Sequence, residues 1–166
     1  MLTSTEGLLA NARKYQASFD KGDLALRPKL GLTVLACMDS RMNIFDIFGL
    51  KEGDAHVIRN AGGAATEDAM RSIVISQRMM GTKEIIVVHH TNCGMLTFRP
   101  EEFIKEIEAE VGMRPTWAVE GFSDTGADVR QTVVRLKSNP FIPDRSNIRG
   151  FVYDVFSGSL SEVVVP

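Results

Sequence analysis

The sequence predicts an α/β fold, with a mostly parallel central sheet that is flanked by helices. Three short strand-like runs alternate with segments that have the periodicity of helices. This alternation is typical of parallel strands joined by crossover helices. In residues 147–166, two further strand-like runs are separated by Ser157-Gly158-Ser159. This pattern predicts a C-terminal hairpin that adds an antiparallel strand at the edge of the sheet.

The first half of the chain contains one helix and two strands. Residues 3–19 have an amphipathic pattern, and Thr3 or Ser4 can cap a helix there. Residues 32–36 are mostly apolar, which is typical of a strand buried on both faces of a sheet. Residues 55–59 are the second strand candidate.

The second half begins with a helix that Thr66 opens and Gly81 ends. Residues 83–90, KEIIVVHH, have the strongest strand signal in the chain. Helices are predicted over residues 100–111, where Pro100 suits a first helical position, and over residues 124–137. No internal repeat or linker interrupts the pattern, so residues 1–166 are predicted to form a single domain.

The composition excludes several classes of partner. Lys and Arg total 19 against 21 Asp and Glu, and the net charge of −2 gives no long-range attraction to nucleic acid. No apolar stretch is long enough to cross a bilayer, so no membrane association is predicted. The N-terminus lacks the basic start and apolar core of a signal peptide, and we expect a cytoplasmic protein.

The chain has only two cysteines, and both follow predicted strands. Cys37 lies at the end of the first strand, and His90 and Cys93 lie at the end of the third. Because ligands of such folds bind beyond the carboxyl ends of the strands, these side chains are expected to meet. Two thiolates and one imidazole suit Zn²⁺, and three protein ligands leave the fourth position that a catalytic zinc needs. Buried core thiols or a disulfide are the alternatives, and an intracellular setting disfavours the disulfide.

Two adjacent histidines compete for the role of ligand. On an extended strand His89 and His90 face opposite ways, so only one can point at the metal. The H-x-x-C spacing favours His90, and His89 is expected to be packed or hydrogen-bonded. Since two thiolates offset the charge of zinc, activity is expected to rise with pH above neutrality.

Asp39 and Arg41 follow Cys37 at alternate positions, so an extended backbone would place all three side chains on one side. Asp39 can occupy the fourth zinc position itself. Alternatively, it pairs with Arg41 and leaves that position to water, in which case the carboxylate orients the zinc-bound hydroxide. A simple surface ion pair is the third alternative.

The pattern C-x-D-x-R, then RNAGG, then H-x-x-C-G resembles the β-class carbonic anhydrases, and the block HHTNCGML resembles their compact branch. The resemblance covers nearly the whole chain. It implies one Zn²⁺ per chain and reversible hydration of CO2 to bicarbonate by zinc-bound hydroxide. It also implies a homodimer, or a tetramer as the larger assembly, in which an N-terminal arm of residues 1–25 packs on a neighbouring subunit.

Position by position, the resemblance implies that the metal ligands are Cys37, His90 and Cys93. It implies that Asp39 and Arg41 are the catalytic dyad. The family's turn near the site corresponds to Asn60, Ala61 and Gly62. Ile44 and Phe45 are expected to line a dry substrate pocket with this turn. One departure is Val34, which stands where some members have a tryptophan beside a regulatory bicarbonate. The only tryptophan here is Trp117, which argues against that switch.

Two other functions stay open. The compact branch also includes enzymes that resemble carbonyl sulfide hydrolases, which use the same zinc motif to release hydrogen sulfide. Carbon disulfide is the less favoured substrate of this second function. Pocket shape and product release would decide between these linear molecules. A non-catalytic zinc or redox-sensing protein is the remaining alternative, although a sensor has no need of the Asp39–Arg41 pair.

Overall fold

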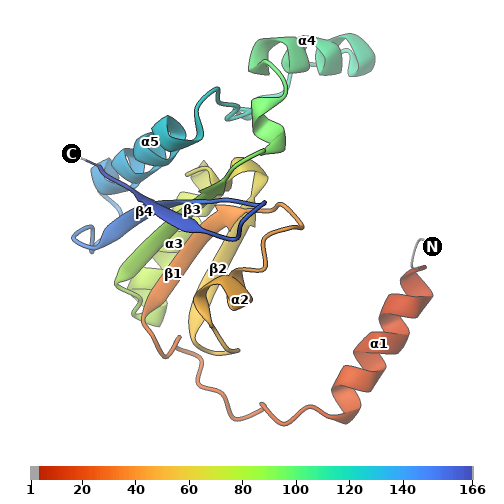
Figure 1. The fold of residues 1–166 in the computed structure, drawn as a ribbon, viewed down its shortest axis with the longest axis vertical. Helices are drawn as coiled ribbons and strands as arrows, with labels where there is room; N and C mark the ends of the chain where they lie inside the picture. Colours follow the sequence, from red (N-terminus) through yellow and green to blue (C-terminus); the bar gives the residue numbers. More distant parts are fainter. Residues whose placement is uncertain (1–3, 166) are drawn as a thin grey trace.

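The protein is described by a computed structural model that covers residues 4–165. Its centre is one five-stranded sheet in the order β2-β1-β3-β4-β5 (Figure 1). The strands are β1 (Leu32–Cys37), β2 (Ala55–Asn60), β3 (Glu84–His90), β4 (Ile148–Tyr153) and β5 (Leu160–Val163). All neighbours run parallel except β4 and β5. The predicted fold class is therefore confirmed, including the antiparallel strand at the edge.

The helices follow the predicted order, with one addition. They are α1 (Thr5–Ala17), α2 (Ile44–Phe48), α3 (Glu67–Met80), α4 (Pro100–Val111) and α5 (Thr125–Ser138), with single 3₁₀ turns η1 (Ala61–Gly63) and η2 (Gly94–Leu96). The sequence did not predict α2, because five residues are too few to show a helical period. Its ends are nevertheless encoded locally. The Asn43 side chain accepts a hydrogen bond from the Asp46 N–H, and Gly49 ends the helix in a left-handed conformation.

Local side-chain chemistry explains the other boundaries. The Thr66 and Asp124 side chains accept hydrogen bonds from backbone N–H groups in the first turns of α3 and α5. Ser4 caps α1, whereas Thr3 lies outside the described residues. The first two strands are each one residue longer than predicted, because Cys37 and Asn60 still pair in the parallel register.

Two apolar clusters cover the two faces of the sheet. Leu35 of β1 packs with residues of α3 and α5, whereas Val34 and Ala36 pack with Ile44 of α2. All six residues of β1 are buried, as the sequence predicted. Cys37 and Cys93 belong to the second cluster, so both thiols lie in a mostly apolar environment.

Helix α1 stands apart from the sheet, at the end of an extended connection (Figure 1). None of its residues is buried. Four apolar side chains of α1 and the residues after it are 47–57% exposed: Leu8, Leu9, Tyr15 and Phe19. Among the described residues, no helix has both the length and the apolar character that crossing a membrane requires.

Candidate metal centre

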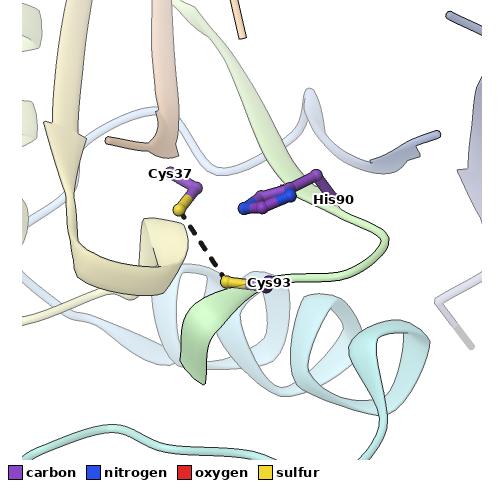
Figure 2. Close-up of side chains that lie close together, drawn as sticks. All are labelled: Cys37, His90 and Cys93. Atoms are coloured by element: carbon purple, nitrogen blue, oxygen red, sulfur yellow. Dashed lines mark hydrogen bonds between the residues drawn. The ribbon is translucent and has the colours of Figure 1, made fainter. Parts of the chain in front are cut away.

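Cys37, His90 and Cys93 converge at one edge of the sheet (Figure 2). Cys37 ends β1 and His90 ends β3, and these two strands are neighbours in the sheet. Thr91 and Asn92 turn the chain so that Cys93 faces back toward Cys37, with 3.9 Å between the two sulfurs. The three candidate ligand atoms all lie within 4.8 Å of one another, and all three residues are buried. The predicted convergence of these side chains is confirmed.

The His90 ring is oriented as a metal ligand would be. Its Nδ1 lies 2.9 Å from the Thr91 carbonyl oxygen, which can only accept, so Nδ1 carries the proton and donates it. Nε2 therefore presents its lone pair. This atom is buried and has no hydrogen-bond partner among residues 4–165. Such an arrangement is usual for metal-binding histidines. The Cys-His-Cys cluster suits a metal site, and its donor set is one that zinc accepts.

The two thiols differ in acidity. The hydrogen bond from Cys93 lowers the pKa of Cys37 far below its usual range, helped by His90 and by the backbone N–H groups of Asp39 and Gly62. The same contact raises the pKa of Cys93, with burial acting in the same direction. The surroundings thus favour a thiolate at Cys37, and thiolates are the form of cysteine that binds metals.

Asp39 and Arg41 form a two-pronged ion pair beside the cluster. Arg41 Nε donates to Asp39 Oδ1 over 2.9 Å, and Nη2 donates to Oδ2 over 2.7 Å. The Arg41 hydrogen bonds hold the pKa of the Asp39 carboxyl well below its usual range. Asp39 Oδ2 lies 3.6 Å from His90 Nε2, next to the candidate ligand atoms. The structure shows the carboxylate paired with arginine, which fits both the hydroxide-orienting alternative and the simple ion pair.

The backbone that brings this pair together is not extended, which corrects the expectation from alternation. Residues 39–42 form a turn in which the Met42 N–H donates to the Asp39 carbonyl over 3.0 Å. The Asp39 side chain also accepts from the Arg41 N–H over 2.9 Å. Aspartate commonly makes such local bonds to the backbone, and they compete with an extended conformation.

Two residues that were not predicted as site residues support this turn. Asn92 accepts from Arg41 through its side-chain and backbone oxygens, both over 2.9 Å. It has a φ of 54°, a left-handed conformation that asparagine tolerates. Arg59 donates to the carbonyl oxygens of Cys37 and Asp39 over 2.6–3.0 Å, so it supports the backbone of the site. The position of Asn92 between His90 and Cys93 was the available signal.

Five residues were predicted to line a substrate pocket, and the structure gives each of them a different environment. Ile44 is 2% exposed and belongs to the apolar cluster that contains both cysteines, whereas Phe45 beside it is 40% exposed. Asn60 pairs with Cys37, and its amide donates to the Ala64 carbonyl over 2.8 Å. Ala61 packs against the same apolar cluster, and Gly62 next to it is buried. Their role in lining a pocket stays a prediction.

The adjacent histidine points to the opposite face. His89 is fully buried, and its Nε2 lies 3.1 Å from the Gly63 carbonyl oxygen. The expectation that His89 is a hydrogen-bonded core residue is therefore confirmed.

Comparison with known proteins agrees with this geometry. The family model for carbonic anhydrase matches residues 32–112. β-Carbonic anhydrase 1 of Mycobacterium tuberculosis is 48% identical over 98% of this chain and 99% of that protein. The structure of a carbonic anhydrase from Streptococcus mutans superposes with a TM-score of 0.87 at 37% identity, covering 99% of this chain and 100% of that one. A carbon disulfide hydrolase of an Acidianus strain is 37% identical over 80% of each chain. From its motifs, its fold and these relatives, this chain belongs to the β-class carbonic anhydrase family.

Proposed function

We propose that the protein is a zinc carbonic anhydrase that hydrates CO2 reversibly to bicarbonate. The observation that carries the proposal is the buried Cys37–His90–Cys93 cluster, in which His90 Nε2 has no hydrogen-bond partner in the described chain. The Asp39–Arg41 pair lies directly beside it. Family membership and near-complete coverage of relatives named as carbonic anhydrases support the assignment.

The cluster would hold one Zn²⁺ per chain through two sulfurs and one imidazole nitrogen. Bound there, zinc would lower the pKa of a water molecule and so supply a nucleophile near neutral pH. The protein's part is to place the groups around that water. Because Arg41 fixes both carboxylate oxygens and favours the ionised form, Asp39 can accept a hydrogen bond from the reacting water and orient it.

Arg41 acts through Asp39 and is itself held by Asn92. Ile44, Phe45 and the Asn60–Gly62 turn would border the substrate, with apolar surface that excludes competing water. CO2 carries no charge, so a small apolar pocket suits it better than a polar one does.

A hydrolase of carbon disulfide or carbonyl sulfide is the second candidate, and the relatives named as carbon disulfide hydrolases favour it. Those relatives match about four-fifths of the chain at 32–37% identity, whereas the β-carbonic anhydrases match 98% at 48%. CO2 is therefore the first choice. A purely structural or sensing zinc site is disfavoured by the Asp39–Arg41 pair, because Asp39 is bound to arginine and leaves a fourth metal position to other ligands.

A homodimer is the assembly that we propose. The isolated α1 carries exposed apolar side chains on an extended connection, which suits an arm of residues 1–25 that packs on a second copy of the chain. The cytoplasm is the proposed location, because a reducing compartment keeps Cys37 and Cys93 as free thiols.

Stopped-flow CO2 hydration by the zinc-loaded protein at mildly alkaline pH tests the function. We expect a kcat/KM that approaches ~10⁷ M⁻¹s⁻¹, in the range of fast enzymes. Sulfide release from carbonyl sulfide and carbon disulfide is measured in parallel. Hydration slower by orders of magnitude, together with rapid sulfide release, would reject CO2 as the substrate in favour of the second candidate.

A further inference from the structure

A buried chain of contacts links helix α5 to the backbone of the metal centre through His89. The His89 Nδ1 lies 3.2 Å from Asp128 Oδ2, and its Nε2 lies 3.1 Å from the Gly63 carbonyl oxygen. His89 is fully buried and the Asp128 side chain is 16% exposed. The ring therefore bridges a carboxylate of α5 and the turn η1.

The position of the His89 ring is restricted on every side. Phe122 stacks on it, with the ring centroids 5.8 Å apart and the planes 22° from parallel. Because a carbonyl oxygen can only accept, Nε2 must carry a proton and donate it to Gly63. Nδ1 and Asp128 Oδ2 are buried, and neither has a well-aligned hydrogen bond within residues 4–165. The 3.2 Å contact between these two atoms places the carboxylate where it can orient the ring.

The turn that His89 holds lies directly against Cys37. A Cβ placed on Gly63 would lie 2.9 Å from the Cys37 backbone nitrogen and 3.0 Å from His89 Cδ2. Gly62 and Gly63 both have left-handed backbones, with φ values of 79° and 75°. The turn η1 directly follows Asn60, which pairs with Cys37 in the sheet. A displacement of Gly63 would therefore displace the backbone of Cys37, a candidate ligand.

We propose that His89, oriented by Asp128, is a positioning residue of the metal centre, which through the Gly63 carbonyl fixes the turn that packs against the backbone of Cys37. The inference rests on the metal site in the proposed function, but not on CO2 as its substrate. Among the described residues, the His89 side chain makes no hydrogen bond or ion pair to Cys37, His90 or Cys93. It acts from the opposite face of the sheet, behind the ligand that it supports.

Substitutions at His89 separate this role from a contribution to core stability. His89→Leu removes the donor to Gly63, whereas His89→Gln keeps an N–H group at the position of Nε2. Partners behind metal ligands typically change metal affinity about 10- to 100-fold when removed. We expect His89→Leu to release zinc to a chelator about 10- to 100-fold faster, and His89→Gln to restore most of the wild-type rate. In the cobalt-substituted protein, His89→Leu should also shift the sulfur-to-cobalt charge-transfer band.

His56→Leu is the matched control. His56 also makes one side-chain hydrogen bond, between Nδ1 and Ser76 Oγ over 2.7 Å, but that bond lies in a different part of the structure. The control should lower the melting temperature while leaving the release rate and the cobalt band unchanged. If His89→Leu does not fold, Asp128→Ala replaces it, and we expect the same faster release of zinc. Asp128→Asn is the conservative variant at this position, because its amide can donate to Nδ1.

A folded His89→Leu or Asp128→Ala protein with the wild-type release rate and cobalt band would overturn the proposal and leave His89 as a core residue. A wild-type protein that binds neither zinc nor cobalt would overturn it together with the metal centre. Failure to hydrate CO2 would reject only the proposed function, since the release rate and the spectrum still report on the position of Cys37.

Discussion

The sulfur atoms of Cys37 and Cys93 lie 3.9 Å apart, although 56 positions separate the two residues in the sequence. The parallel pairing of β1 with β3 creates this closeness, because it brings the carboxyl ends of both strands to one edge. The site is therefore a product of the sheet topology, and any change that weakens this pairing should weaken metal binding as well.

Removing the metal should destabilise the protein. A ligand that binds only the folded state, at 100 times its dissociation constant, adds about 2.7 kcal/mol to the free energy of unfolding. We expect the melting temperature to rise when zinc is added to the metal-free wild type and to fall again with a chelator. Cys37→Ser should lose this response together with activity. A Cys37→Ser protein with full activity and no metal would contradict the assignment of Cys37 as a ligand.

Replacing Arg41 with lysine should lower kcat/KM about 10- to 100-fold. Lysine keeps the positive charge but cannot hold both oxygens of Asp39 as the guanidinium does. Stopped-flow hydration measures the effect. Arg114→Lys is the control, because Arg114 pairs with two exposed glutamates, Glu101 and Glu108. This substitution should leave the rate unchanged. Equal rates for Arg41→Lys and wild type would show that the pair does not orient the reacting water.

Gly63→Ala should cost more stability than Gly112→Ala. Both glycines have left-handed backbones, with φ values of 75° and 74°, so each substitution costs about 1–2 kcal/mol of backbone strain. At Gly112 nothing lies within 4 Å of the added carbon, but at Gly63 it meets Cys37 and His89. The extra crowding should add about 1–3 kcal/mol, measured by urea unfolding of the metal-free proteins. Equal losses at the two positions would mean that the turn yields without cost.

The Asp39–Arg41 coupling should disappear in acid. The guanidinium lowers the folded-state pKa of Asp39, so the pair stabilises the protein above the unfolded-state value, about 3.9. That stabilisation is lost as the pH falls through the lower, folded-state pKa. A double-mutant cycle with Asp39→Asn and Arg41→Gln, measured by unfolding of metal-free protein, should give constant coupling between pH 5 and 7. Coupling that declines across that range would contradict a lowered pKa.

Much of the site was predictable because strand periodicity and sheet topology constrain it. The alternation of side chains along a strand makes His89 and His90 face opposite ways. The parallel strands β1 and β3 end at the same edge of the sheet, which brings Cys37 close to His90. The local turn at Asp39 was not predicted, since side-chain bonds to the backbone override the extended pattern there. The contact between His89 and Asp128 was also beyond sequence reasoning, because it depends on how α5 packs against β3.

The decisive measurement is a titration of zinc into metal-free protein, followed by the rate of CO2 hydration. The rate should rise linearly and reach a plateau at one zinc per chain, with Cys37→Ser giving no rise. A rate that does not respond to zinc, or that stays near the uncatalysed value after zinc has bound, would contradict the proposed function.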